Sequence, residues 1–440
     1  SDGSNYLVAW TDMRHRSTKP DIYCNRVYQS GMTRDSAALQ VCRAPGVQDS
    51  IRLAYCRGRY LAVWLDRRTG QREIYAARLD STGRKIDTAD IRIAGGHVQG
   101  LAVCAGDSNW LVAWCGLGHS QLLDVKATAV SLSGDVSHPD GTSITFTNTS
   151  EFWPAVAFDG HRFHVCWHTY RNIQTSYEVA GVVLPPDSLS PSAMRYISNK
   201  VGGDELVALT RGYDCVLAVW LNEYPSNYRS VLATRLDTSG VPLDSPPITL
   251  ALVNRSFGAP MSVFFDSYYY VLWQWKIDNV RWYYGGARLT TGGGVMDTFA
   301  LAPSESTRWS VGLGAADDQA LLVYPKVIDS IGGIRVELRR MIGLQSPFGD
   351  IEETGPASSQ RAMAMPNPFR STTRLAIPRL AGQAVDVFNA AGRKVKMLTP
   401  DAAGNSAWLG DDECGRTVAP GVYFASAGDG EAPLRLVRLR

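Results

Sequence analysis

Seven aliphatic runs along the chain each end in a large aromatic residue, and the seven are almost evenly spaced. The aromatic residues that end them are Trp10, Trp64, Trp114, Trp167, Trp220, Trp273 and Tyr324. The steps between them are 54, 50, 53, 53, 53 and 51 residues. A period of this order, made of short strands, is typical of the blades of a β-propeller. The pattern therefore predicts an all-β fold whose larger part is a seven-bladed β-propeller.

The second repeat shows the expected blade most clearly. Strands are predicted at 51–55, 60–64, 73–79 and 91–94, separated by turns that contain Asp, Gly and Ser. Residues 60–64 are apolar throughout rather than alternating, which indicates a strand covered on both faces. We therefore expect the seven aromatic rings to pack between neighbouring blades. The first run begins at Tyr6 with no strand before it, so we expect an incomplete first blade, and upstream blades are left open.

The composition changes after the seventh repeat. Residues 1–345 are assigned to the propeller, and 346–360 to a linker because this stretch is rich in Ser, Pro, Gly and Glu. Residues 361–440 carry short strand-like segments with turn signals every 8–12 residues. This spacing predicts a second domain, a small β-sandwich.

Three motifs in the second domain carry a resemblance. They are Pro366-Asn367-Pro368-Phe369, the segment 387–395, and Gly415 followed by Gly421-Val422-Tyr423-Phe424. In this order they resemble the C-terminal sorting domain of type IX-secreted proteins and the Ig-like domain of the flagellar hook-capping protein. The resemblance covers about 365–440, and it departs from the family at Trp408-Leu409-Gly410, where such domains carry Trp-Asp-Gly.

The resemblance implies an Ig-like fold and export by an outer-membrane secretion machinery. It also implies an extracellular location, or attachment to the outer membrane at the cell surface. The basic and apolar segment 434–440 matches the last strand of the family, with an ordinary edge strand as the alternative interpretation.

Composition narrows the function classes. The net charge is +2, which argues against a dedicated nucleic-acid partner, and no apolar stretch is long enough to be a transmembrane segment. The eight cysteines show no CxxC and no metal-like spacing with His, so no metal and no cofactor are predicted. Cys24 and Cys42 flank a turn on successive predicted strands, so a disulfide between them is possible. His161, His164 and His168 are interpreted as packed or surface side chains.

The loops between second and third strands should converge on one face of the ring, together with the loops that join blades. Exposed-looking aromatic side chains and an arginine fall in or beside these loops. The candidate ligand-binding residues are Trp153, Tyr170, Arg171, Tyr224, Tyr228, Trp275, Trp282 and Trp309. Flat aromatic faces beside arginine stack on sugar rings or on peptide side chains, although packing of the loops against one another is the alternative. We therefore expect a secreted or cell-surface protein that binds a protein or glycan ligand non-catalytically.

Two other functions stay open. A sialidase-like glycoside hydrolase would need an arginine cluster and a Tyr–Glu pair, and Arg14, Arg68, Arg171, Tyr170 and Glu223 are the residues that could supply them. The Ser-x-Asp-x-Gly-x-Thr-Trp motif of that family does not occur in the sequence. An architectural component of a surface layer or filament is the third possibility. Whether the protein is an enzyme is left undecided, and no catalytic residue is assigned.

Overall fold

The computed structural model consists of two compact units, Ser1–Thr354 and Gly355–Arg440. It describes residues 1–14, 20–118, 121–172, 176–198, 202–223, 229–253, 258–276, 282–304, 311–316, 319–328, 333–342, 351–353, 363–365, 372–376, 384–389, 393–401, 405–426 and 434–438. All regular elements in these ranges are strands. The predicted all-β class is confirmed for the described part of the chain.

The first unit contains seven antiparallel sheets in its described residues, and each sheet orders its strands as they follow in sequence. The first sheet has three strands, β1 (Asn5–Asp12), β2 (Asp21–Tyr28) and β3 (Leu39–Cys42). The second has β4 (Gln48–Cys56), β5 (Arg59–Asp66), β6 (Glu73–Asp80) and β7 (Ile91–Ala94). The third has β8 (Val98–Ala105), β9 (Asn109–Leu117), β10 (Leu123–Ser131) and β11 (Thr142–Ser143).

The remaining sheets of this unit have four strands each. The fourth has β12 (Glu151–Phe158), β13 (Phe163–Asn172), β14 (Ser176–Leu184) and β15 (Arg195–Tyr196). The fifth has β16 (Gly203–Arg211), β17 (Val216–Glu223), β18 (Arg229–Leu236) and β19 (Ile248–Val253). The sixth has β20 (Met261–Phe265), β21 (Tyr268–Lys276), β22 (Trp282–Thr290) and β23 (Val295–Ser304). The seventh has β24 (Gly312–Ala316), β25 (Gln319–Ile328), β26 (Gly333–Ile342) and β27 (Ile351–Glu353).

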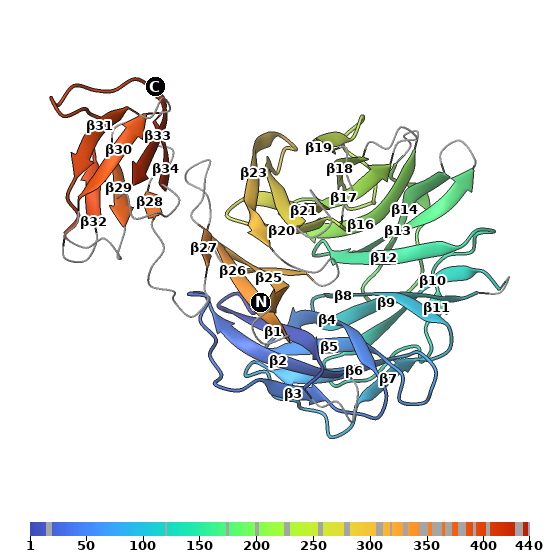
Figure 1. Ribbon diagram of the computed structural model, residues 1–440. Helices are drawn as coiled ribbons and strands as arrows, with labels where there is room; N and C mark the ends of the chain where they lie inside the picture. Colours follow the sequence, from blue (N-terminus) through green and yellow to red (C-terminus); the bar gives the residue numbers. More distant parts are fainter. Residues whose placement is uncertain are drawn as a thin grey trace. The chain divides into compact units, whose positions relative to one another are not determined.

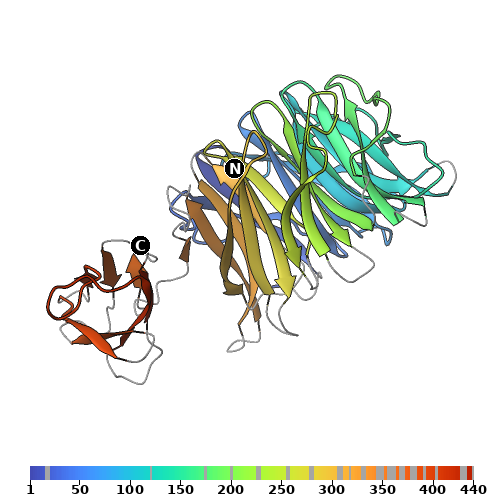
Figure 2. The ribbon, with the colours of Figure 1, turned by 90° about the horizontal axis from the view of Figure 1, so that it is seen from above.

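Successive sheets follow one another around a circle (Figure 1; Figure 2). The first strands of neighbouring sheets contact each other from β4 through β8, β12, β16 and β20 to β24. Strand β1 contacts both β4 and β24, and the hydroxyl of Tyr6 donates a hydrogen bond to the carbonyl oxygen of Gln319 at 3.1 Å. Radial repetition of four-stranded antiparallel sheets is the architecture of a β-propeller.

The hydrophobic core lies between neighbouring sheets. Trp64, Trp114, Trp167 and Trp220 are at most 1% exposed, and Trp273 and Tyr324 are also buried. Each core cluster combines side chains of two successive sheets, for example Leu61 and Val63 of β5 with Trp110 and Trp114 of β9. The expected packing of the aromatic rings is confirmed for these six. Trp10, on an edge strand of the three-stranded first sheet, is partly exposed.

An arginine recurs in four sheets, on β2, β6, β18 and β22, and pairs with an aspartate nine residues later. The pairs are Arg26–Asp35, Arg78–Asp87, Arg235–Asp244 and Arg288–Asp297. The backbone N–H of Arg235 also donates to Asp244, at 2.8 Å, and its guanidinium donates to the carbonyl oxygen of Thr291 in the next sheet. This ion pair, here called the arginine clamp, therefore ties a strand to its own turn and one sheet to the following sheet.

The second unit contains two sheets around one core. One sheet is β28 (Met363–Met365), β29 (Thr373–Ala376) and β32 (Asn405–Trp408). The other is β31 (Lys394–Leu398), β30 (Val385–Asn389), β33 (Gly421–Ser426) and β34 (Leu434–Arg438). Trp408 of the first sheet is fully buried and packs at 5.0 Å between ring centroids on Tyr423 of the second. The described residues of this unit thus form two sheets that share one hydrophobic core.

Two details differ from the sequence-based expectations. Strand β27 lies inside the predicted linker 346–360 and pairs with β26, so the last sheet of the first unit extends into that segment. Cys24 and Cys42 are free thiols, because the register places Cys24 opposite Leu39 and Cys42 opposite Ile22. The predicted disulfide is therefore wrong. Burial raises the pKa of each of these two thiols to about 12.

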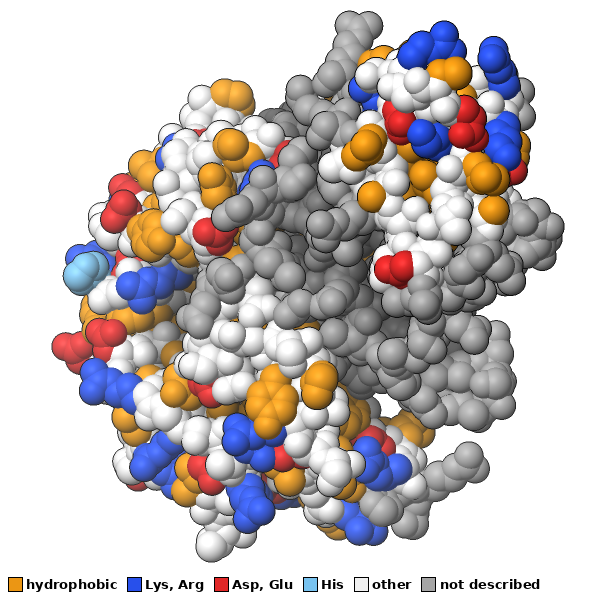
Figure 3. Space-filling model, turned by 90° about the vertical axis from the view of Figure 1, so that its left-hand side faces the viewer, with side chains coloured by type: hydrophobic (Ala, Val, Ile, Leu, Met, Phe, Trp, Pro, Cys, Tyr) orange, Lys and Arg blue, Asp and Glu red, His pale blue; other side chains and the backbone are white. Residues whose placement is uncertain are grey.

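The surface carries both signs of charge side by side. On the face drawn in Figure 3, basic, acidic and hydrophobic side chains alternate without a large field of one kind. None of the described elements is a helix long and apolar enough to cross a membrane. This mixed surface agrees with the small net charge of +2.

Candidate functional site

The fourth sheet brings three of the predicted binding residues onto one blade. Trp153 lies on β12, and Tyr170 and Arg171 lie at the end of β13. Trp153 is 52% exposed and Tyr170 is 39% exposed, so both rings present area to solvent. Consecutive residues on a strand point to opposite faces of the sheet, so Tyr170 and Arg171 face different neighbours.

Trp153 owes its exposure to a β-bulge. The pairing of β12 with β13 shifts register between Phe152 and Ala155, and Trp153 takes φ = 53°. Three other first strands have the same bulge, with Ser50, Gly100 and Leu206 at positive φ. Positive φ is costly for a bulky side chain, and such outliers gather at functional sites. Gly100 leaves room for the bulge, since a Cβ there would lie 3.1 Å from Cα of Trp153.

Aromatic rings line the face of the fourth sheet that is turned to the fifth. His168 stacks on Phe152 at 5.7 Å between ring centroids, and Tyr177 meets Phe152, His168 and Tyr170 edge-on at 6.1, 5.6 and 5.9 Å. His168 accepts a hydrogen bond at Nδ1 from the backbone N–H of Leu206. Burial lowers the pKa of His168 to about 4, so the ring is neutral near pH 7. Tyr170 therefore packs on a cluster of rings through its contact with Tyr177, which holds its side chain in place.

Arg171 is held on the opposite face by a buried carboxylate. Its Nη1 donates to both carboxylate oxygens of Glu178, at 2.8 and 2.9 Å, and Glu178 is fully buried. The guanidinium also lies 4.2 Å from the ring centroid of Tyr196. The second sheet has a related arrangement, in which Arg68 pairs with Asp66 of β5 and lies 3.9 Å from the ring of Tyr75 on β6. Arg171 is therefore part of a repeated structural device.

Two buried carboxyl groups have a raised pKa, Glu151 on β12 of the fourth sheet and Asp204 on β16 of the fifth sheet. Burial raises the pKa of Glu151 to about 7, although hydrogen bonds from Thr147 and Thr145 oppose the shift. Burial likewise raises the pKa of Asp204 to about 6, and Asp204 accepts hydrogen bonds from Trp220 and Asn222, each at 2.8 Å. Both side chains are fully buried. Because neither carboxyl group is exposed to solvent, neither can contact a ligand bound at the surface in this conformation.

The other predicted residues are placed less completely. Trp275 and Trp282 lie at the paired ends of β21 and β22, on the sixth sheet. Tyr224, Tyr228 and Trp309 lie outside the described residues. The structure therefore brings Trp153, Tyr170 and Arg171 onto one sheet and places the two tryptophans on another.

The described residues do not bring together the arginine cluster and Tyr–Glu pair that a sialidase-like hydrolase would need at the surface. Glu223 is exposed and pairs with Arg229 at 2.6 Å, while Arg14 pairs with Asp12 and Arg68 with Asp66. Each of these charges is satisfied within its own blade. Among the described residues, no group of three or more His, Cys, Asp or Glu is placed to hold a metal ion.

Five residues around this surface were not predicted from the sequence: Tyr177, Glu178, Tyr196, Glu151 and Asp204. Tyr196 lies 25 residues beyond Arg171 and reaches it only because β15 pairs with β14. The other four lie on strands whose hydrophobic pattern drew attention to packing. A signal existed for Glu178, because acidic residues stand at the start of the equivalent strands β2, β6 and β10, namely Asp21, Glu73 and Asp124.

The fold and the blade-end surface define a β-propeller protein. No protein-family model matches the chain, and neither does any curated protein. Among solved structures, the β-propeller domain of the Trilobed protease from Pyrococcus furiosus is similar at 11% identity, with a TM-score of 0.45, covering 81% of this chain and 97% of that one.

Other similar structures are named for enzymes. The neuraminidase-like protein of A/flat-faced bat/Peru is 9% identical, with a TM-score of 0.42 and coverage of 69% of this chain and 89% of that one. An exo-1,5-alpha-L-arabinanase from a bovine ruminal metagenomic library is 12% identical, with a TM-score of 0.36 and coverage of 58% and 97%. These are distant likenesses of fold and carry nothing about function.

Proposed function

We propose that this chain is a seven-bladed β-propeller protein that binds a glycan non-catalytically at the end of its fourth blade. The single observation that carries the proposal is Trp153, a half-exposed tryptophan held at positive φ on the innermost strand. A strained backbone that presents a large apolar side chain to water is unfavourable for folding alone. A ligand that stacks on the indole would account for it.

The chemistry of the surface favours a sugar ring. Indole and phenol rings offer flat faces to the C–H groups of a pyranose, and the phenol hydroxyl offers a hydrogen bond. Tyr170 supplies the second ring and rests on Tyr177, so its orientation is set before the ligand arrives. Preorganised rings lose little side-chain entropy on binding.

A glycan array followed by calorimetry on the best glycan tests the proposal. We expect Trp153→Ala and Tyr170→Ala each to weaken binding by at least about tenfold, which corresponds to about 1.4 kcal/mol. Phe146→Ala is the matched control, because Phe146 is a large exposed aromatic residue on the third repeat. Arg171 is a poor probe, since its loss would leave Glu178 buried and unpaired.

Two results would overturn the proposal. One is a glycan whose affinity is unchanged in both aromatic variants. The other is an array without any hit together with capture of a protein ligand that loses affinity in Trp153→Ala, which would assign the same surface to a protein.

A glycoside hydrolase is the second candidate function. The observation in its favour is the pair of carboxyl groups, Glu151 and Asp204, whose pKa values are raised into the range of a catalytic acid. If the protein cleaves the glycan, release of reducing ends should disappear in Glu151→Gln or Asp204→Asn. Cleavage that survives both variants would remove these carboxyl groups from the account, and absence of cleavage by the wild type leaves the binding function.

We further propose that Gly355–Arg440 is an Ig-like sorting domain that directs export to the cell exterior. The motifs that resemble such domains lie in this unit, and a two-sheet core around Trp408 supports an independently packed module. In the source organism, a chain ending at Thr354 should stay inside the cell, whereas the full chain reaches the surface or the medium. Equal export of both chains would contradict this role.

A further inference from the structure

The fourth sheet lacks the arginine clamp. Register places Val183 opposite His164, as Arg78 stands opposite Leu61 and Arg235 opposite Leu217. Ser192 follows Val183 by nine residues and accepts a hydrogen bond from its backbone N–H at 3.1 Å, as Asp244 does from Arg235. The third sheet has Ala129 at the arginine position, opposite Leu111. Neither the cation nor the carboxylate of the clamp remains in the fourth sheet.

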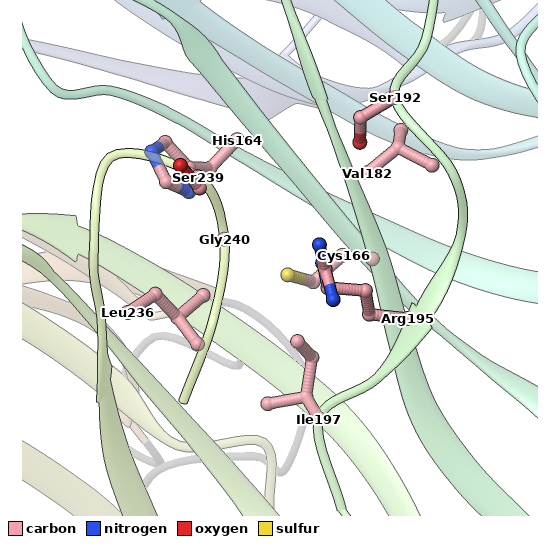
Figure 4. A pocket seen from close by; sticks show the side chains of 10 residues that line it. His164, Cys166, Val182, Ser192, Arg195, Ile197, Leu236, Ser239 and Gly240 are labelled. Atoms are coloured by element: carbon pink, nitrogen blue, oxygen red, sulfur yellow. The ribbon is translucent and has the colours of Figure 1, made fainter. Parts of the chain in front are cut away.

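A small pocket lies where the fourth sheet meets the turn between β18 and β19 (Figure 4). The pocket is small and partly open to solvent, so a ligand there would stay in contact with water on one side. The lining comes from four places, and its residues are His164, Cys166, Gly181, Val182, Ser192, Arg195, Ile197, Leu236, Ser239 and Gly240. At the next junction the guanidinium of Arg235 reaches Thr291 of the corresponding turn, at 3.1 Å. The pocket therefore occupies the place that a clamp arginine fills elsewhere.

A buried histidine supplies one polar wall. His164 replaces the leucine of the neighbouring repeats and is 1% exposed. Its Nε2 lies 2.9 Å from Oδ2 of Asp159, whereas its Nδ1 is buried without a hydrogen-bond partner. Burial would raise the pKa of Asp159, but hydrogen bonds from His164 and from the backbone N–H groups of Arg162 and His161 outweigh it and lower the pKa. The charged carboxylate of Asp159 therefore orients the imidazole through Nε2, and Nδ1 of His164 has no hydrogen-bond partner.

An arginine that arrives from a different strand supplies the other polar wall. Arg195, at the start of β15, is exposed and lines the pocket. Among the described residues no carboxylate pairs with it, in contrast to the clamp arginines. Arg211 of β16 adds positive charge beside the same blade end, because a Cβ on Gly160 would lie 2.8 Å from its Nη2. The pocket thus combines an unpaired guanidinium with an unsatisfied imidazole nitrogen.

We propose that this pocket binds a small oxyanion, held by the guanidinium of Arg195 and by Nδ1 of His164. The guanidinium presents parallel N–H donors that match two oxygens of a phosphate or carboxylate. Nδ1 donates to the ligand when the imidazole is protonated, and accepts from a ligand O–H when it is neutral. The hydroxyl of Ser239 is a further donor on the rim. This site is distinct from the aromatic surface, because His164 and Tyr170 lie near opposite ends of β13.

The lining disfavours a metal ion in the same place. Burial raises the pKa of the Cys166 thiol to about 12, so the sulfur stays protonated and is a poor ligand. Arg195 repels a cation, and Asp159 already accepts from His164. An anion is the charge type that the unpaired groups fit.

Isothermal titration calorimetry of the full chain with inorganic phosphate, at constant ionic strength, tests the proposal. We expect one binding event per chain with millimolar affinity, weakened at least about tenfold in Arg195→Gln. The double variant Val183→Arg with Ser192→Asp rebuilds the clamp of the second and fifth sheets in the pocket, so it should abolish binding. Arg162→Gln removes an exposed cation of the turn between β12 and β13 that does not line the pocket, so this control variant should bind phosphate as the wild type does.

Acetate replaces phosphate in a second arm and shows whether a carboxylate suffices. Binding of either anion that depends on Arg195 supports the proposal. Binding that persists unchanged in the clamp-restoring double variant would place the anion elsewhere. Absence of heat with both anions in the wild type would overturn the proposal outright. The aromatic variants of the glycan site should leave this titration unchanged, so the two assignments fail separately.

Discussion

The second and fourth sheets are built on the same four-strand repeat, yet their surfaces differ. Both bury a tryptophan at the same position, Trp64 and Trp167, between neighbouring sheets. In the second sheet, an ion pair lies at each end: Asp66 with Arg68 at one end, and the Arg78–Asp87 clamp at the other. The fourth sheet instead presents exposed rings at one end and a pocket at the other.

The comparison of these two sheets helps to distinguish residues that serve folding from residues that serve function. A residue that recurs at the same position in several sheets solves a packing problem that every blade shares, as Arg68 and Arg171 do over a tyrosine ring. A residue that breaks the pattern at a cost to stability requires another reason. The positive φ of the bulge recurs in four sheets, but only the fourth places a half-exposed tryptophan there, Trp153. This side chain breaks the pattern, and so does His164 with its unsatisfied nitrogen.

The largest expected effect comes from breaking the clamp of the second sheet. Arg78→Met leaves Asp87 with 9% of its side chain exposed and without its guanidinium, which should destabilise the protein by about 4 kcal/mol. Urea unfolding measures the change. Arg195→Met on the fourth sheet removes an exposed, unpaired arginine and should change stability by less than about 0.5 kcal/mol. Equal costs would mean that the clamp has no special role.

The next effect depends on pH and concerns equivalent positions of the two sheets. Glu151 stands on β12 where β4 has Gln48, opposite Thr169 and Asp66 respectively. Its pKa is about 7 in the folded state against 4.5 as the ordinary value, so between these values the folded state binds more protons than the unfolded state. This group therefore makes stability fall as pH rises from 4.5 to 7.

Glu151→Gln copies the second sheet and removes that loss. Relative to wild type, we expect the variant to gain up to about 3 kcal/mol between pH 4.5 and pH 7, measured as the difference between two unfolding curves at each pH. His168, whose pKa is lowered to about 4, acts in the opposite direction in both proteins and cancels in the difference. A difference independent of pH would show that Glu151 is not desolvated.

The smallest effect distinguishes the two bulges. Trp153→Gly and Ser50→Gly both relieve a positive φ, and each should raise stability by about 1 kcal/mol or leave it unchanged. Only Trp153→Gly should weaken glycan binding. If Trp153→Gly destabilises the protein by several kcal/mol, the indole is a packing residue and the functional interpretation of its strain is wrong.

The repeat and its core could be predicted from sequence because the five-residue run that ends in each aromatic residue is apolar in almost every repeat, with His164 as an exception. Predicted strands 73–79 and 91–94 agree with β6 (Glu73–Asp80) and β7 (Ile91–Ala94) to within one residue. The short strand β27 was missed because three residues in a polar segment carry no periodicity. The disulfide was predicted wrongly because symmetry about a turn does not determine register, which places Cys42 opposite Ile22.

The sites were only partly predictable, for a different physical reason. Exposed-looking aromatic residues could be read from loop positions, which identified Trp153 and Tyr170. The partner of Arg171 is Glu178, across a hairpin, and the ring beneath Arg171 comes from β15, so neither could be assigned by spacing alone. The absence of the arginine clamp can be read from the sequence, because Val183 and Ser192 stand in place of Arg and Asp. That this absence leaves a pocket could be recognised only in the structure.

Hydroxyl-radical footprinting of the full chain, free and with the glycan selected on the array, tests the central claim most directly. Trp153 and Tyr170 should be oxidised in the free protein and protected when the glycan is bound. The exposed aromatic residues Phe146 and Tyr213, on other repeats, should be oxidised equally in both states. Protection at those two residues, with Trp153 and Tyr170 still oxidised in the complex, would contradict the assignment of the binding surface to the fourth sheet.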